Sequence, residues 1–255
     1  MLKGGGRVMG VFTVASQKGG VGKTMLAISL AQALSEQMQD KVLFVPLDNQ
    51  GGTSKRAFKL QANKRVLNGM FLGQEYDIQK VSEHLYSLSS DRTIHNLDRT
   101  EFEHAVNFAN EIKKLKAEYP YIVIDTPPGL GARITAAILA ADHIVVPIEC
   151  EASALEGMVE LRDTIRKLTR FNPRARINSL VVNKYKHTKE QREILKVLET
   201  RFQDVLINPV IPDVQPIKSA GAAGRAVWHQ AVNGNHRTAA KIVKSVISRI
   251  VKKVN

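Results

Sequence analysis

The sequence predicts an α/β fold, a doubly wound and mostly parallel β-sheet flanked by helices. Two observations lead to this prediction. Short, continuous apolar runs alternate with segments of helical periodicity, and the first of these runs stops at a glycine-rich loop that opens a helix. Strands that are apolar along their whole length are typical of a parallel sheet with helices on both faces. The alternation of strands and helices then favours the doubly wound arrangement.

The strands are the clearest elements. Residues 8–15 form a β-branched apolar run, and residues 25–37 carry apolar side chains at helical spacing. Four further strands are predicted at residues 41–47, 121–125, 143–148 and 177–182. Each is bounded by a helix-like segment, which is the pattern of repeated strand–helix–strand units.

The segment between residues 53 and 115 is less regular. We expect a helix over residues 65–72, a strand over residues 84–88 and a long amphipathic helix over residues 101–118.

The C-terminal part contains turn-forming residues. Three prolines interrupt residues 208–216, and the small residues at 218–224 favour a flexible loop over one edge of the sheet. The chain then carries an amphipathic helix at about residues 235–254.

Length and composition favour one domain over residues 1–255, because 44% hydrophobic residues supply a substantial core. No helix-turn-helix segment precedes the first strand, so we expect no separate N-terminal DNA-binding domain. No apolar run reaches the about 18 residues of a membrane span, and the N-terminal apolar stretch is too short for a secretory signal. A cytoplasmic protein is expected.

The single cysteine, Cys150, excludes an internal disulfide and a cysteine-only iron–sulfur or zinc site within one subunit. A dimer that shares ligands between subunits stays open as an alternative. A small buried core residue is the favoured interpretation.

The positive charge is concentrated in the last third of the chain. Residues 1–159 contain 17 Lys+Arg and 17 Asp+Glu, whereas residues 160–255 contain 20 and 7, which accounts for the whole net charge of +13. A one-sided basic excess attracts polyanions and releases their counterions. Nucleic acid or an acidic membrane surface is therefore the expected partner, with a merely soluble basic face as the alternative.

The glycine-rich loop has the composition of a phosphate-binding loop and lies between a strand and a helix. In such a loop the backbone N–H groups and the helix N-terminus bind phosphate oxygens. We expect Lys23 to neutralise the β- and γ-phosphates of ATP and the Thr24 hydroxyl to ligate Mg²⁺. The nucleotide-binding residues predicted here are Gly19, Gly20, Val21, Gly22, Lys23, Thr24 and Met25. Gln17 stands where the strict pattern has its first glycine, and an extra lysine, Lys18, precedes the glycines.

This loop, KGGVGKT, resembles the deviant Walker A motif of the ParA/MinD group of P-loop ATPases. The resemblance implies that Lys18 reaches across an ATP-bridged homodimer to the phosphates bound by the other subunit. A solvated loop charge is the alternative role for Lys18. An extra cation is favourable where two subunits close over a tetra-anionic ligand, and loss of the γ-phosphate should weaken the dimer.

The segment after the second strand, LDNQGG, resembles the family's second-strand motif. The resemblance assigns to Asp48 the orientation or polarisation of the attacking water; a helix-capping role is the alternative. Pro46 replaces the family's first aspartate, Asn49 its usual proline, and Met25 a common second threonine. These departures leave the rate of hydrolysis and the nucleotide affinity open.

Asp125 ends a buried strand at the Walker B position, from which it can hold a Mg²⁺-bound water. Gly129 allows the next loop to approach the γ-phosphate. The resemblance also assigns adenine recognition to Asn183 and closure over the base to Pro212 and Asp213. Asn183 as an ordinary turn residue stays open.

The resemblance extends from Val11 to the C-terminus and is weakest between residues 53 and 115. The iron-protein branch of the superfamily is excluded by its cysteine requirement. The MinD branch binds membranes through a C-terminal amphipathic helix, but here we prefer a helix that packs its apolar stripe on the sheet, so membrane binding is not expected. A dethiobiotin-synthetase-like ligase would need neither Lys18 nor the basic C-terminal third.

The partition branch fits the charge distribution. It implies slow ATP hydrolysis, binding of the dimer to nonspecific double-stranded DNA, nucleoid association, and stimulation by a ParB-like centromere-binding protein. A MinD-like or cargo-positioning ATPase is the alternative. The candidate DNA contacts are Arg170, Arg174, Arg176, Lys184, Lys186, Lys218, Arg225, Lys241 and Lys244.

Overall fold

The computed structural model describes residues 9–48, 52–61, 65–99, 101–230 and 232–253. They form an eight-stranded sheet in the order β3-β4-β2-β5-β1-β6-β7-β8, and only the pairing of β3 with β4 is antiparallel. The strands are β1 (Gly10–Val14), β2 (Val42–Pro46), β3 (Ile78–Lys80), β4 (Leu85–Leu88), β5 (Tyr121–Asp125), β6 (His143–Ile148), β7 (Ile177–Val182) and β8 (Leu206–Ile207). This is the doubly wound, mostly parallel sheet that the sequence predicts.

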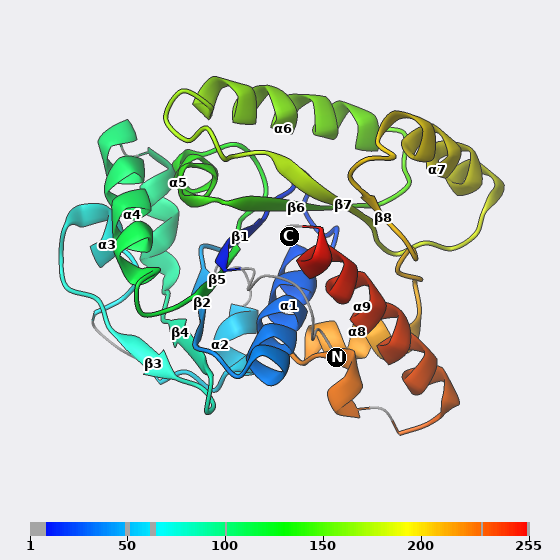
Figure 1. Ribbon diagram of the computed structural model, residues 1–255, viewed down its shortest axis with the longest axis horizontal. Helices are drawn as coiled ribbons and strands as arrows, with labels where there is room; N and C mark the ends of the chain where they lie inside the picture. Colours follow the sequence, from blue (N-terminus) through cyan, green and yellow to red (C-terminus); the bar gives the residue numbers. More distant parts are fainter. Residues whose placement is uncertain (1–8, 49–51, 62–64, 100, 231, 254–255) are drawn as a thin grey trace.

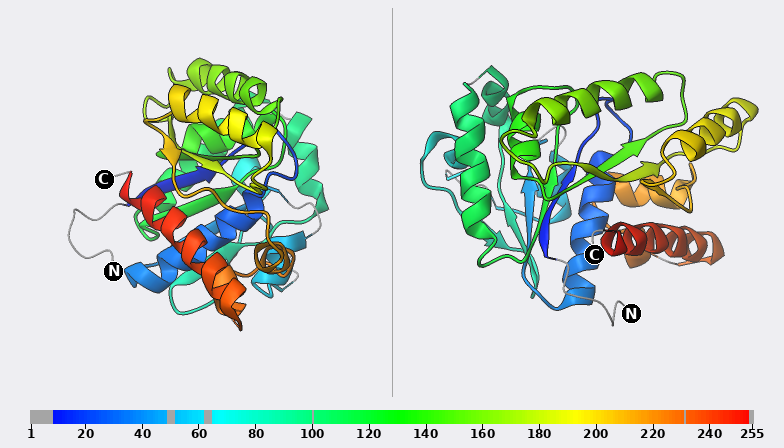
Figure 2. Two further views of the ribbon diagram at one scale, coloured as in Figure 1. Left: turned by 90° about the vertical axis from the view of Figure 1, so that its right-hand side faces the viewer. Right: turned by 45° about the horizontal axis from the view of Figure 1, so that its top comes forward.

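Helices cover both faces of the sheet (Figure 1). One face carries α1 (Lys23–Met38), α2 (Thr53–Ala57), α8 (Gln215–Ala222) and α9 (Gly234–Lys252), with the 3-10 helix η3 (Val227–Gln230) beside them. The other face carries α3 (Gly69–Leu72), α4 (Phe102–Leu115), α5 (Ala132–Ala140), α6 (Ala154–Leu168) and α7 (Lys189–Arg201), with the 3-10 helix η2 (Arg92–Arg99). The two further views in Figure 2 show the same layers.

The burial of the strands explains this layering. All residues of β1, β2 and β5 are buried, as the continuous apolar runs predict. Within β1, Phe12 and Val14 pack in the core under α1 and α9, whereas Val11 packs in the core under α4 and α5. Successive side chains of a strand point to opposite faces, so each central strand contributes to both cores.

The predicted flexible loop at residues 218–224 is wrong for most of that segment, because Gln215–Ala222 forms helix α8. Pro216 lies in the first turn, where a proline costs no helical hydrogen bond. Ile217 and Ala220 are buried in the core that α8 shares with α1 and α9. Small residues therefore serve close helix packing here.

One other expectation is wrong. The predicted helix at residues 65–72 is reduced to Gly69–Leu72, because Leu67 donates its backbone N–H to the carbonyl of Ser89 at the end of β4. The sequence does not predict the short strands β3 and β8, since three and two residues carry too little pattern. Val8, expected in the first strand, lies outside the described residues, and β1 begins at Gly10.

The C-terminal helix α9 packs its apolar stripe inside the protein. Val243, Val246, Ile247, Ile250 and Val251 are buried in the core that also contains residues of α1 and β1. The preferred packing of this helix on the sheet is therefore confirmed. Among the helices of the described ranges, none is both long and apolar enough to cross a membrane.

Candidate functional site

The predicted nucleotide-binding residues gather at the carboxyl ends of three adjacent strands. In the register of the sheet, Asp125 of β5 lies beside Val14 of β1 on one side and Pro46 of β2 on the other. The phosphate loop leaves β1 and Asp48 follows β2, so the parallel strands bring the loop and both aspartates to one edge. The Leu47 N–H donates to the Asp125 carbonyl at 2.8 Å and fixes the two strand ends together.

The phosphate loop contains two residues that require glycine. Gly20 and Gly22 have φ angles of 78° and 93°, in the left-handed region. A Cβ at Gly22 would lie 2.2 Å from Asn183 Nδ2, so any side chain there would displace Asn183. The loop is therefore shaped both by its own backbone and by the end of β7.

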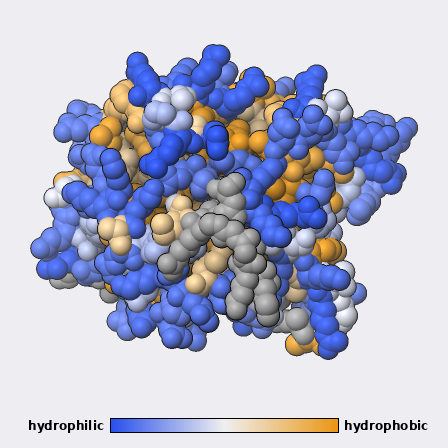
Figure 3. All heavy atoms as spheres, viewed as in Figure 1, coloured by the Kyte–Doolittle hydropathy of each residue, from blue (hydrophilic) through white to orange (hydrophobic). Residues whose placement is uncertain are grey.

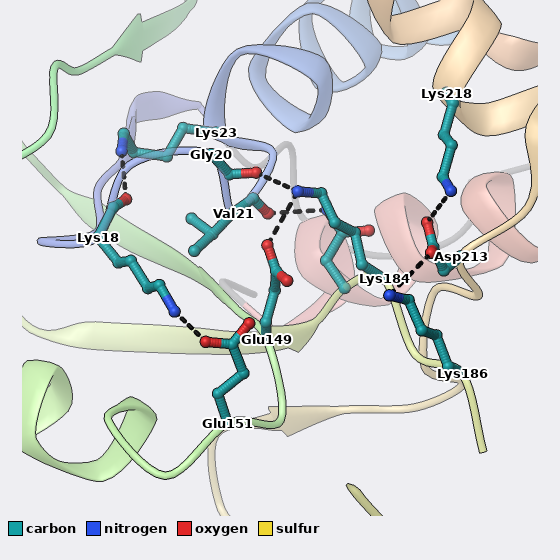
Figure 4. A network of polar contacts seen from close by, with 11 residues as sticks. Lys18, Gly20, Val21, Lys23, Glu149, Glu151, Lys184, Lys186, Asp213 and Lys218 are labelled. Atoms are coloured by element: carbon teal, nitrogen blue, oxygen red, sulfur yellow. Dashed lines mark hydrogen bonds and ion pairs between the residues drawn. The ribbon is translucent and has the colours of Figure 1, made fainter. Parts of the chain in front are cut away.

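Two residues that follow β7 hold the phosphate loop from the side, and Figure 4 labels one of them, Lys184. Asn183 Nδ2 donates to the Val21 carbonyl at 2.8 Å, and Lys184 Nζ donates to the Gly20 carbonyl at 2.5 Å. Lys184 also forms an ion pair with Glu149, at 2.9 Å. These contacts fix the carbonyl side of the loop, which leaves its N–H groups to bind an anion.

Lys23 is 5% exposed, and its Nζ donates to the carbonyl of Lys18 at 2.9 Å. Burial lowers the pKa of Lys23, and the negative charges of Asp125 and Asp48 oppose that shift. Within the described ranges the Lys18 carbonyl is the one hydrogen-bond acceptor of Lys23 Nζ. A buried ammonium with so few acceptors gains most from a strong anion, because burial of a charge is costly without a partner.

Lys18 forms an ion pair with Glu151, which follows β6 in the same chain (Figure 4). Both side chains are 45% exposed. The attraction of Lys18 lowers the pKa of Glu151. The lysine that the sequence analysis expects to act on a partner subunit thus has an acidic partner within its own chain.

Asp125 is fully buried, and no hydrogen bond of normal geometry reaches either of its carboxylate oxygens from the described residues. Burial raises its pKa to about 8, while the nearby Thr24 hydroxyl and Lys23 ammonium act in the opposite direction. A buried carboxylate in this environment is suited to a cation or a cation-bound water, which supports a Mg²⁺ site at Thr24 and Asp125. No cluster of three or more His, Cys, Asp or Glu side chains in the described ranges is placed to hold a metal ion.

Arg133 is a site residue that the sequence analysis missed. It is 4% exposed and lies in the first turn of α5. Its Nη1 donates to the Leu47 carbonyl at 2.8 Å, immediately before Asp48, and its Nε donates to Asp98 Oδ1 at 2.9 Å. The side chain therefore connects α5, the helix η2 and the end of β2. No local motif marks such a residue, because its partners are distant in the sequence.

Comparison with known proteins gives the family. The family model of an AAA domain matches residues 9–177. The chromosome partitioning protein ParA of Caulobacter vibrioides is 29% identical over 252 residues, which cover 94% of each chain. Protein IncC of Escherichia coli is 34% identical over 188 residues, 71% of this chain and 51% of that protein. A putative plasmid partition protein of Borrelia burgdorferi, solved with AMPPNP, has a TM-score of 0.81 and 25% identity and covers 95% of this chain and 98% of its own.

The chain belongs to the ParA family of P-loop ATPases. A structure of a Cyanothece McdA–ATP complex shares the fold, with a TM-score of 0.83 at 18% identity, over 97% of this chain and 98% of its own. The family model and the partition-protein relatives confirm the ParA-family assignment that the motifs suggest, and with it the P-loop ATPase class.

Of the residues that the ParA resemblance assigns to the base, Asn183 contacts the phosphate loop directly, and Pro212 and Asp213 lie beside the segment that follows it. Pro212 forms a parallel β-bridge with Tyr185, and Tyr185 directly follows Asn183 and Lys184 in the chain. Asp213 forms ion pairs with Lys218 at 2.9 Å and with Lys186 at 3.6 Å (Figure 4). In this structure the Asn183 amide group donates its hydrogen bond to the Val21 carbonyl of the phosphate loop, so its assignment to adenine stays a prediction.

The candidate DNA contacts divide into separate groups. Arg170, Arg174 and Arg176 surround the turn before β7, at the amino end of the strand. Lys184 and Lys186 follow β7. Asp213 forms ion pairs with both Lys186 and Lys218 of α8, so Lys218 belongs to the same group. Lys241 and Lys244 lie on α9, and Arg225 precedes η3. The first two groups therefore lie at opposite ends of β7, and Arg174 already pairs with Asp142 at 3.2 Å.

Two other predicted features, Cys150 and Met25, are located by the structure. Cys150 is 2% exposed, and burial raises its pKa to about 11, which supports the core interpretation. Met25 packs near Gly221 of α8, whose added Cβ would lie 3.3 Å from Met25 Cγ. Asn49 lies outside the described residues.

Proposed function

We propose that this ParA-family chain is a DNA-partition ATPase. In this proposal residues 1–255 act as one ATPase domain that hydrolyses ATP to ADP and phosphate, forms an ATP-bridged homodimer and binds DNA without sequence preference. A ParB-like protein stimulates hydrolysis and releases the dimer from the nucleoid. The single observation that carries the proposal is the presence of Lys18 beside Lys23 at the edge where Asp48 and Asp125 converge.

The phosphate loop performs the binding step. The Lys23 ammonium exchanges the Lys18 carbonyl for the β- and γ-phosphate oxygens of ATP, which are stronger acceptors. The N–H groups of the loop and of the first turn of α1 bind the same phosphates. The exchange also frees the backbone of Lys18 to adjust when the second subunit approaches.

Thr24 and Asp125 would hold Mg²⁺, Asp125 through water, and the cation would neutralise charge on the phosphates during transfer. Asp48 orients the attacking water at the γ-phosphate. Arg133 holds the carbonyl before Asp48 and so limits the positions that this carboxylate can take.

Dimer formation is the step that requires Lys18. Its ammonium leaves Glu151 and binds the phosphates in the other subunit, where water exclusion strengthens the interaction. Hydrolysis removes the γ-phosphate and weakens this contact, which returns the subunits to separate states.

The test measures three properties with ATP, ADP and no nucleotide: light scattering, binding to unrelated duplex DNA and binding to anionic liposomes. We expect dimers and DNA binding with ATP alone. Binding to liposomes in the absence of DNA binding would contradict the partition function. Single subunits at every protein concentration with a nonhydrolysable triphosphate would contradict the dimer.

Two variants separate the roles of the residues. Lys18→Ala should keep nucleotide binding and lose the ATP dimer, with Lys113→Ala at an exposed position of α4 as the matched control. Asp48→Ala should remain dimeric on DNA while turnover falls by about 100-fold. A monomeric Asp48→Ala protein in saturating ATP would contradict the assigned roles.

A further inference from the structure

An open groove lies between α6 and the end of α7. Its volume is about 480 Å³, and it reaches the amino ends of β7 and β8. The floor is apolar: Met158 and Ile165 of α6 are buried, and Phe202 and Val205 are partly buried. Figure 3 shows hydrophobic atoms exposed among hydrophilic ones over the region in which Figure 1 draws α6, β7 and α7.

Four arginines surround this floor. Arg162 and Arg166 come from α6, Arg176 from the turn before β7, and Arg201 from the end of α7. All four are exposed. We refer to this feature as the arginine groove. Three separate elements thus direct guanidinium groups to one apolar depression.

Few acidic groups offset this charge. Among the described residues that line the arginine groove, Asp204 is the one carboxylate, and Lys253 lies close enough to interact with it. Arg166 is near Asp163 of the same helix, but at 3.9 Å this is a loose pair. The groove therefore has a strong net positive potential, which favours an anionic occupant.

The apolar floor and the surrounding arginines together indicate which class of ligand the groove binds. Contacts to a DNA backbone use cations and need no apolar floor. Arginine binds carboxylates in a bidentate manner, and an amphipathic segment places apolar side chains into a groove while its flanks remain polar. We propose that the arginine groove binds an acidic amphipathic segment of a partner protein, with its apolar side chains on Met158, Ile165 and Phe202 and its carboxylates on the arginines.

The location makes this site independent of the nucleotide. The phosphate loop lies at the carboxyl end of β1, whereas the arginine groove lies at the amino end of the parallel strand β7. The inference goes beyond the partition function, since it requires neither ATP nor a second subunit. A failure of one proposal leaves the other intact.

The test uses a fluorescein-labelled synthetic peptide of about 18 residues, with leucines at helical spacing on one face and glutamates beside them. We expect binding to the full-length protein, measured by fluorescence anisotropy without nucleotide. Arg162→Glu with Arg201→Glu should weaken it at least about tenfold. The matched control, Arg192→Glu with Lys196→Glu on exposed positions of α7, changes net charge equally outside the groove and should weaken it far less.

A second peptide with each glutamate replaced by glutamine should bind at least about tenfold more weakly, and both double variants should keep the wild-type ATPase rate and thermal midpoint. Equal binding of the two peptides would overturn the proposal, as would equal losses in the two double variants. Loss of duplex DNA binding by the Arg162→Glu/Arg201→Glu protein with unchanged peptide affinity would instead assign the groove to DNA.

Discussion

At the residue scale, the ion pair of Lys18 with Glu151 has the largest consequence for the proposed dimer. Both side chains are about half exposed, and a surface pair of this kind contributes only about 0 to 1 kcal/mol. Lys18 can therefore leave Glu151 at low cost when phosphate of a second subunit becomes available. The ion pair is weak enough for Lys18 to exchange Glu151 for phosphate, and strong enough to influence the equilibrium between monomer and dimer.

We expect Glu151→Gln to shift ATP-dependent dimerisation to a protein concentration about two- to fivefold lower, because Lys18 then loses its charged intrachain partner. Sedimentation with a nonhydrolysable ATP analogue measures the shift. Glu156→Gln, an exposed position in the first turn of α6, is the control. A weaker dimer in Glu151→Gln would show that Glu151 acts in the dimer instead.

Arg133 allows a second prediction at this scale. Arg133→Met leaves the Leu47 carbonyl and Asp98 without their donor, so we expect a loss of about 2–4 kcal/mol in the free energy of unfolding. Turnover should fall with little change in KM, since Asp48 is less well positioned. Urea denaturation and steady-state kinetics check both effects. Adding Asp98→Asn should restore part of the stability; a loss no larger than that of Lys113→Met would contradict the role.

The sequence predicts site residues only where a motif contains them. Lys18, Lys23 and Thr24 follow from one heptapeptide, and Asp125 follows from its place at the end of an apolar run. Glu151 and Arg133 are different, because their partners lie 133 and 35 residues away. Only the folded chain brings these groups together, and no spacing rule identifies them.

At the element scale, predictability follows the length and uniformity of the apolar pattern. The central strands β1, β2, β5, β6 and β7 are largely apolar, and the sequence predicts each of them. Helix α8 is different, because glycine and alanine have little hydrophobic signal and the nearby prolines suggest a loop. Its helical state depends on packing against α1 and α9, which is information from the tertiary structure.

Helix α9 provides a prediction that separates core packing from membrane binding. Ile250 is fully buried, so Ile250→Ala should reduce the free energy of unfolding by about 2–5 kcal/mol. Affinity for anionic liposomes should not change. Urea denaturation and liposome flotation measure the two properties. Loss of liposome binding without loss of stability would mean that the stripe is a membrane anchor.

At the scale of the whole molecule, the basic residues proposed to contact DNA include two groups that lie at opposite ends of β7. If the dimer closes over ATP at the carboxyl edge, the cations nearest that edge are Lys184, Lys186 and Lys218, whereas Arg170 and Arg174 lie at the opposite end of β7. The two groups cannot contribute to one flat surface of a single subunit. We infer that the group at the carboxyl edge contacts DNA.

Salt dependence tests this inference. Lys186→Gln with Lys218→Gln should reduce the slope of log affinity against log salt by about one unit for each lysine, because fewer counterions are released. Arg170→Gln with Arg174→Gln should leave the slope nearly unchanged. Binding to unrelated duplexes over a range of salt concentrations measures both. The reverse result would place DNA at the amino end of the sheet.

Strand β7 joins the two ends of the molecule that these proposals concern. It begins directly after Arg176 and ends directly before Asn183, which holds the phosphate loop through Val21. Six extended residues span only about 20 Å, and neighbouring strands pair with β7 on both sides. Amide hydrogen exchange along this one strand should therefore respond both to nucleotide at one extremity and to a bound peptide at the other.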